Sequence, residues 1–230
     1  MKSRYLLIAL VLTLIISSCA PIKKAERLYK GLEFSKAVPV YEKIAASENK
    51  HSVKAYERLG DINRLSSHFE QSAAAYKKAI ELKPDYEEPF EELGLLYALK
   101  GDRLAIDYLT SAININPQNL NAMYALGLFY QDHSMMQKAL DTYQDIINIE
   151  PKHADALHNV GYINLVFKKS YTDALTLFTK AIEADTNFYQ AYFNRGITYE
   201  HLNDCSKAQA DFKKVLEIYP EHKLAKEHLN

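Results

Sequence analysis

The stretch Tyr192-Phe193-Asn194-Arg195-Gly196-Ile197-Thr198-Tyr199 decides the fold of this chain. Its glycine lies within a segment of helical apolar spacing, where glycine costs about 1 kcal/mol relative to alanine. Similar glycines recur at intervals of 34, 33, 34 and 35 residues, at Gly60, Gly94, Gly127, Gly161 and Gly196. Such a repeated cost indicates that each missing side chain lets two helices approach closely.

Other residue types recur in step with these glycines. Large residues precede each glycine by four positions, at Tyr56, Phe90, Met123, Leu157 and Tyr192. Small residues, which we expect to face the glycines from a second helix, are Ser72, Ala105, Ala139, Ala174 and Ala208. A further large series is Tyr76, Leu109, Tyr143, Phe178 and Phe212. Each unit closes at Pro84, Pro117, Pro151, Thr186 or Pro220. Since proline stops a helix, each unit is predicted as two antiparallel helices joined by a short turn.

This pattern resembles the tetratricopeptide repeat (TPR). The resemblance implies an all-α fold, an α-solenoid of about five to six TPR helix-turn-helix units with a short C-terminal capping helix. The expected units are 53–86, 87–119, 120–153, 154–188 and 189–222. A one-residue deletion near Gly101 and an insertion near Lys168-Lys169-Ser170 are placed in inner turns, which tolerate length changes best.

The two ends of the array depart from the repeat. Residues 22–51 are predicted to form a degenerate first unit, in which Ala25 replaces the glycine and Pro39 lies in the first turn of the second helix. Residues 223–230 are predicted to form the capping helix, with Leu224 and Leu229 covering the last unit. Solenoids need such caps because their terminal faces are otherwise open.

The first residues have the features of a signal peptide, predicted over 1–18. Tyr5 to Ile16 is an apolar core too short to span a membrane. Ile16-Ser17-Ser18-Cys19 resembles the lipobox of bacterial lipoproteins, which implies a covalent lipid, including palmitate, on Cys19 and a lipidated N-terminus over 19–21. By resemblance to lipoproteins of double-membrane bacteria, Ala20 after the cysteine implies the outer membrane, and the lack of an acidic run favours its periplasmic face. In a single-membrane bacterium the same motif implies the outer face of the cytoplasmic membrane. Plain secretion and an uncleaved anchor are the alternatives.

Composition argues against several classes of function. The 230 residues are 48% hydrophobic and 25% charged with a formal net charge of −1, which is typical of a folded protein and not of a nucleic-acid binder. No phosphate loop, dinucleotide fingerprint, zinc motif or nucleophile elbow is present. We therefore expect no enzyme activity, no cofactor beyond the lipid, no metal and no small-molecule substrate.

The resemblance also places a concave groove on the first helix of each unit. Mapped onto this chain, its C-terminal half offers Tyr124, Leu128, His158, Asn159, Tyr162, Phe193, Asn194 and Ile197. Asn159 and Asn194 occupy the same position in successive units, and an amide matches the N–H and C=O groups of an extended peptide. Two interpretations stay open: these residues bind a peptide, or they serve the packing of the repeats.

Charge is uneven along the chain. Residues 22–58 carry nine Lys or Arg and five Glu, and residues 81–92 carry five Glu, one Asp and one Lys. The basic segment adjoins the predicted lipid anchor, so it either favours anionic lipid headgroups or is a solvated surface. The acidic segment is likewise a site for a basic partner or a solvated helix start.

These features predict a membrane-anchored TPR scaffold or adaptor of the bacterial cell envelope, which binds a segment of a partner protein in its concave groove. The alternatives are a structural assembly factor for an outer-membrane machine, similar to the pilotins, and a protease adaptor in envelope maintenance. Cys205 is either a thiol available for intermolecular pairing or, as we expect, a packed small residue.

Overall fold

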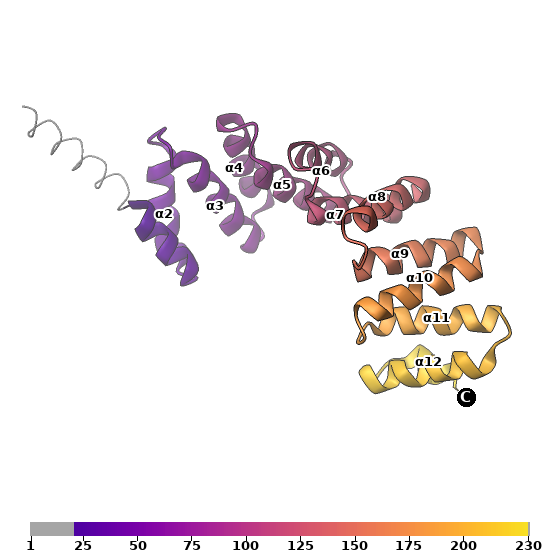
Figure 1. Ribbon diagram of the computed structural model, residues 1–230. Helices are drawn as coiled ribbons and strands as arrows, with labels where there is room; N and C mark the ends of the chain where they lie inside the picture. Colours follow the sequence, from indigo (N-terminus) through magenta and orange to yellow (C-terminus); the bar gives the residue numbers. More distant parts are fainter. Residues whose placement is uncertain (1–20, 230) are drawn as a thin grey trace, which may run out of the picture. The chain divides into compact units, whose positions relative to one another are not determined.

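The computed structural model describes residues 21–229, and these residues form helices and short turns without any strand (Figure 1). The chain divides into two compact units, one ending at Pro117 and the other beginning at Gln118. Each unit is described by itself below. The all-α fold of consecutive helix pairs agrees with the fold class predicted from the sequence.

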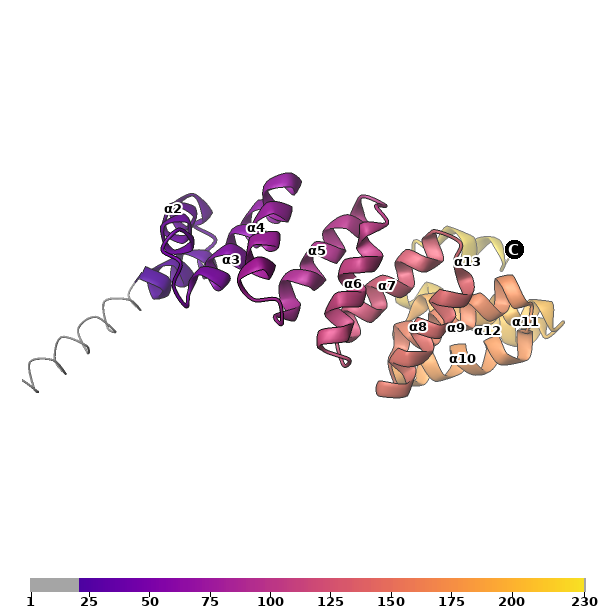
Figure 2. The same cartoon turned by 90° about the horizontal axis from the view of Figure 1, so that it is seen from above.

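The first unit starts with helical residues 21–30 and continues with five helices. These are α2 (Phe34–Ala45), α3 (Ser52–Leu65), α4 (Phe69–Leu82), α5 (Glu87–Leu99) and α6 (Leu104–Ile115). From α2 to α6, each helix packs against the helix that follows it (Figure 2).

The second unit continues the same alternation. Its helices are α7 (Leu120–Asp132), α8 (Met136–Ile149), α9 (Ala154–Ile163), the π-helical turn η1 (Asn164–Lys168), α10 (Tyr171–Ala184), α11 (Tyr189–His201), α12 (Cys205–Ile218) and α13 (Lys223–Glu227). Successive helices again pack together along this unit. The second helix of a pair ends two residues before the proline of its unit, as for Ile149 and Pro151.

The repeat glycines allow the two helices of a pair to meet, but a large side chain fills the contact. A Cβ atom added to Gly127 would lie 2.5 Å from Cε1 of Tyr143, and one added to Gly196 would lie 2.7 Å from Cε1 of Phe212. The expectation that small residues face the glycines was therefore wrong in detail. Small residues such as Ala139 are buried, but the large ring one turn further along the helix takes the space above the glycine.

The inner turn of every pair contains one residue in the left-handed backbone region, and only one of them is a glycine. These residues are Leu32, Ser67, Gly101, Ser134, Lys169 and Asn203, with φ between 53° and 66°. Glycine adopts this region at little cost, whereas other residues are strained there. This series could not be predicted from residue types, because its members share no common chemistry.

The one-residue insertion in the fourth full repeat lies at the end of the first helix, before the inner turn in which it was expected. The end of the first helix widens into the π-helical turn η1 before the left-handed Lys169. A π-turn holds one more residue than an α-turn, so the helix itself takes up the extra residue.

Two predictions about the terminal units were also wrong. Pro39 lies in the second turn of α2, because this helix already begins at Phe34. The carbonyl of Ser35, which a residue-39 amide would have bonded, is on an exposed residue and can be hydrated. In the capping helix the prediction was wrong for Leu224, which is 53% exposed, and right for Leu229, which packs against the last unit together with Ala225.

The predicted signal peptide (1–18), Cys19 and most of the predicted lipidated N-terminus (19–21) lie outside the described residues. Among residues 21–229, no helix combines the length and the apolar character that a membrane span requires.

Candidate functional site

Five of the eight predicted groove residues line a single hollow of about 210 Å³ in the second unit. Its lining consists of Gln131, His158, Asn159, Tyr162, Gln190, Phe193, Asn194 and His222. These side chains come from α7, α9, α11 and the residue that precedes α13. None of them is a carboxylate, a lysine or an arginine, so the hollow offers hydrogen bonds and aromatic faces without a fixed charge.

The other three predicted residues lie beside this hollow and do not line it. Tyr124 is half-buried, and its hydroxyl contacts Asn159. Leu128 is 36% exposed. Ile197 packs against the core residues around Phe178 and Phe212.

A row of hydrogen bonds runs across three helices at the base of the hollow. Nδ2 of Asn194 donates to Nε2 of His158 at 2.8 Å. Because that nitrogen accepts, Nδ1 of His158 carries the proton and donates to Oδ1 of Asn159 at 3.1 Å. Nδ2 of Asn159 then donates to the hydroxyl of Tyr124 at 3.4 Å. The row ties α11 to α9 and α9 to α7.

The two repeat-equivalent asparagines therefore differ in what they can bind. Asn159 is 8% exposed, and both ends of its amide have partners within the protein. Asn194 is half-buried, and its Oδ1 has no hydrogen-bond partner among the described residues. The sequence predicted that both side chains bind a peptide. In this geometry only Asn194, of the two, has an amide oxygen available to a ligand.

His158 is held in its neutral form. Burial lowers its pKa, against smaller raising effects of the Asn159 hydrogen bond and the Asp155 carboxylate. Its ring packs against Phe178 and Phe188, with centroid distances of 5.6 and 5.0 Å. A neutral ring matches the hydrogen-bond row, since a second ring proton on Nε2 would face the donating amide of Asn194.

Two other histidines of this unit serve as helix caps. Nδ1 of His153 accepts a hydrogen bond from the N–H of Ala156, and Nδ1 of His222 accepts one from the N–H of Ala225. Each satisfies a free amide at the start of a helix. In the described residues, no group of three or more His, Cys, Asp or Glu side chains has the arrangement of a metal site.

The corresponding charged residues of the first unit bind one another. Arg58 forms ion pairs with Asp61 at 2.7 Å and with Glu26 at 3.3 Å. The hydroxyls of Tyr29 and Tyr76 also donate to Asp61, at 3.1 and 2.8 Å. These carboxylates are engaged within the unit, so this face is less available to a ligand than the hollow of the second unit.

Sequence reasoning did not select three residues of the hollow, namely Gln131, Gln190 and His222. Both glutamines occupy groove positions of their repeats, so the repeat register carried a signal for them. His222 precedes the capping helix at the position that His153 has before α9. The equivalence of His153 and His222 is the signal in the sequence that locates His222 beside the last groove positions.

Cys205 is exposed, which contradicts the expected packed position. It is the first residue of α12, and its repeat position faces solvent in this unit. The thiol is therefore open to reagents.

Comparisons with known proteins agree with this architecture. A profile described as "TPR repeat" matches residues 60–101, and profiles described as "Tetratricopeptide repeat" match residues 121–153 and 177–210. Among solved structures, a MamA protein is 28% identical, with a TM-score of 0.66 over 79% of this chain and 98% of MamA. YrrB, whose structure is described as a TPR protein with an unusual peptide-binding site, is 25% identical, with a TM-score of 0.66 over 81% of this chain and 96% of YrrB.

Curated relatives share the repeats over part of their length. The BBSome complex member bbs-4 of Caenorhabditis elegans is 26% identical over 72% of this chain and 34% of that protein. The human peptidyl-prolyl cis-trans isomerase FKBP4 is 32% identical over 45% of this chain and 26% of that protein. The chain thus spans about a third or less of these relatives, and the isomerase likeness does not show catalysis. The repeat fold points to a non-catalytic role in protein interaction, and the chain is a tetratricopeptide repeat protein.

Proposed function

We propose that this chain is a membrane-anchored scaffold of the bacterial cell envelope, which captures an extended segment of a partner protein in the hollow of its second unit. One observation carries the proposal. The hollow joins uncharged hydrogen-bonding side chains to aromatic faces, and Asn194 presents an amide oxygen without a partner among the described residues.

This lining suits a peptide backbone with an uncharged side chain. Oδ1 of Asn194 can accept a hydrogen bond from a peptide N–H, and the amides of Gln131 and Gln190 can bond to peptide groups on either side. Phe193 and Tyr162 provide apolar contact area at low cost in side-chain entropy. The likeness to YrrB, itself described as having a peptide-binding site, supports this assignment.

The anchor is the second part of the proposal. Ile16-Ser17-Ser18-Cys19 supports acylation of Cys19, Ala20 supports an outer-membrane position, and the lack of an acidic run after it supports the periplasmic side. Acyl chains on one residue would confine the scaffold to that surface and raise its local concentration near membrane partners. Mass spectrometry of the protein purified from its own membranes measures the lipid directly. An unmodified Cys19 would overturn the anchor and leave the hollow untouched.

The binding role is tested by crosslinking and co-purification of the full protein from its own membranes. The test variant carries Gln190→Ala and Asn194→Ala, which remove two amides from the hollow. The matched control carries Gln144→Ala and Asn148→Ala, an exposed amide pair on α8 whose side chains bond each other at 3.2 Å. Both variants are first checked for a cooperative thermal unfolding transition above the assay temperature, because Asn194→Ala also removes a hydrogen bond between α11 and α9.

A partner that is lost in the hollow variant and kept in the control supports segment capture. A partner kept by both variants contradicts it and favours an assembly subunit that uses another face of the protein.

A further inference from the structure

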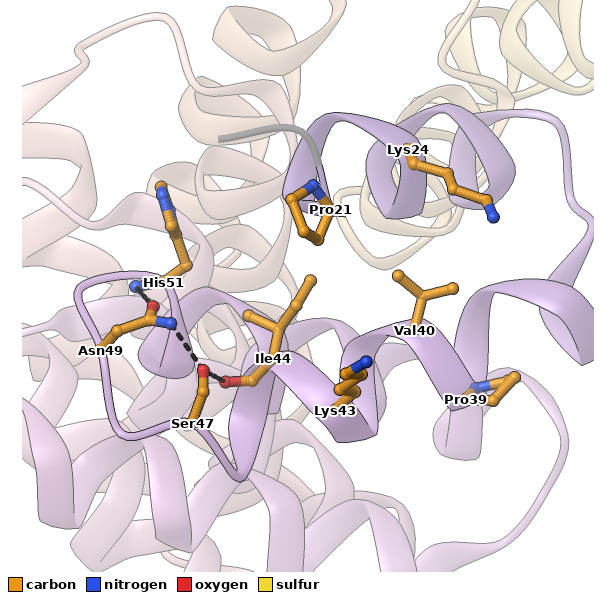
Figure 3. A pocket seen from close by; sticks show the side chains of 9 residues that line it. All are labelled: Pro21, Lys24, Pro39, Val40, Lys43, Ile44, Ser47, Asn49 and His51. Carbon is orange, nitrogen blue, oxygen red and sulfur yellow. Dashed lines mark hydrogen bonds between the residues drawn. The ribbon is translucent and has the colours of Figure 1, made fainter. Parts of the chain in front are cut away.

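A second and larger hollow lies on the first helix pair, at the beginning of the described chain. Its volume is about 630 Å³, within the range of about 300–1,000 Å³ of small-molecule sites. Pro21, Pro39, Val40 and Ile44 supply its apolar surface. Figure 3 shows Lys24 on the helix of Pro21 and Lys43 on α2, with Val40 between them and Ile44 beside Lys43, below Pro21.

Two lysines that form no ion pair within the described residues, Lys24 and Lys43, line this hollow. The ion pairs recorded for residues 22–58 use Lys36, Lys54 and Arg58. The exposed basic residues that have no recorded ion pair in the described part of the chain are Lys23, Lys24, Arg27, Lys30, Lys43 and Lys50. Only two acidic residues of this segment, Glu42 and Glu48, are likewise unpaired. Residues 22–58 thus keep an excess of four positive charges outside these ion pairs, and Lys24 and Lys43 are the two basic side chains among them that lie at the hollow.

One residue of the hollow is also close in sequence to the proposed site of lipid attachment. Pro21, which lines it, is two residues after Cys19. Two residues span at most about 7 Å, so an acylated Cys19 would bring this surface to the lipid headgroups.

We propose that the hollow binds an anionic phospholipid of the membrane, with one acyl chain against Val40 and Ile44 and the headgroup phosphate between Lys24 and Lys43. The inference rests on the membrane position in the proposed function. An apolar floor beneath basic side chains matches the two parts of such a lipid, since lysines attract the anionic leaflet surface and apolar contacts favour the acyl chain. Bound in this way, the first helix pair would lie on the membrane and the scaffold would have a fixed face toward it.

The test uses the chain from residue 19 onward with Cys19→Ser, which carries no lipid and keeps every residue that the structure describes. Sedimentation with vesicles measures its binding to phosphatidylcholine alone and to phosphatidylcholine mixed with phosphatidylglycerol. We expect binding to the mixed vesicles. Lys24→Glu with Lys43→Glu should weaken it by at least about tenfold, because each basic residue contributes to attraction at an anionic surface.

Lys180→Glu with Lys213→Glu is the matched control, since it makes the same change in net charge on exposed residues of the second unit. Its binding should stay near that of the parent. Equal losses in the two variants, or no binding by the parent, would overturn the site. Because this protein carries no acyl group, the result does not depend on whether Cys19 is acylated in cells.

A second measurement asks whether an acyl chain enters the hollow. The chain contains no tryptophan, so Pro39→Trp places a single indole at the edge of the hollow, and Tyr219→Trp places one on an exposed residue of the second unit. Phosphatidylglycerol with brominated acyl chains should quench the tryptophan fluorescence of Pro39→Trp and leave that of Tyr219→Trp unchanged. Equal quenching, or none, would mean that no acyl chain occupies the hollow.

Discussion

Nδ2 of Asn194 donates a hydrogen bond to Nε2 of His158 over 2.8 Å, which joins the first helices of two successive repeats. This contact fixes the tautomer of His158 and turns its Nδ1 proton toward Asn159. Asn159 and Asn194, which the repeat pattern predicts as two separate contacts to a bound peptide, thus belong to one connected row of hydrogen bonds. The row keeps Asn159 inside the protein and leaves Oδ1 of Asn194 for a ligand.

Acidic pH should destabilise the second unit through His158. Burial lowers the pKa of His158 from its ordinary value near 6.5, so below that value the unfolded chain binds a proton that the folded chain rejects. The stability that the neutral ring provides is complete above about pH 6.5 and is lost as the pH falls through the lowered pKa. Thermal unfolding midpoints between pH 5 and 8 measure this loss.

His158→Gln should make the pH dependence shallower, whereas the exposed His68→Gln should leave the parental slope. The same slope in all three proteins would show that the protonation of His158 is not linked to folding.

Gly127→Ala should destabilise the protein by about 1–3 kcal/mol, even though alanine favours helices. The added methyl group would meet the buried ring of Tyr143 at 2.5 Å. Gly31→Ala is the control, because the nearest atom to its added Cβ is 3.4 Å away. Urea unfolding of both variants checks the prediction, and an equal or higher stability of Gly127→Ala would show that the helices separate at little cost.

Lys169→Gly should stabilise the protein by up to about 1 kcal/mol. Lys169 has a φ of 53°, where a Cβ atom is strained and glycine is not. The neighbouring Lys168→Gly should act in the opposite direction, since residue 168 belongs to the π-helical turn. Thermal unfolding of the two variants measures the direction of each change in stability. A loss of stability in both variants would show that Lys169 is not the strained residue of this turn.

Asp211→Ala should cost about 3–5 kcal/mol, because it leaves a largely buried guanidinium without its carboxylate. Nε and Nη2 of Arg195 each donate to Asp211 at 2.8 Å, and the two side chains are 17% and 7% exposed. Replacing both residues, Arg195→Met with Asp211→Leu, should recover most of the loss. A double-mutant cycle by urea unfolding measures the coupling, and additive losses would mean that the pair contributes nothing beyond its separate side chains.

Cys205 should react with a maleimide in the folded protein as fast as an exposed thiol, since its side chain is exposed at the start of α12. The measurement is the labelling rate in buffer and in urea, using the chain with Cys19→Ser so that one thiol remains. Labelling that occurs only in urea would contradict the exposed position.

The sequence alone determined the helix pairs, the position of each glycine contact and the helix ends at the prolines. Gly127 illustrates why: the apolar period of a helix records which side meets its neighbour, and this record is local. The residue that fills the contact, Tyr143 and not the expected Ala139, followed only from the fold. The repeat pattern also predicted which residues of the first helices share one face, because residues at the same place in successive repeats lie at the same place on their helices.

Only the tertiary structure decided which of these positions remains open to a ligand. Asn159 and Asn194 share a repeat position, yet Asn159 is enclosed by hydrogen-bond partners. One partner, His158, belongs to the same repeat, and the other, Tyr124, belongs to the preceding repeat. Similarly, Cys205 and Leu224 fit packed positions of the pattern and are exposed. The physical reason is that a periodic pattern specifies the face of a helix, whereas burial and hydrogen bonding of one side chain depend on the particular neighbours that the fold brings to it from other repeats.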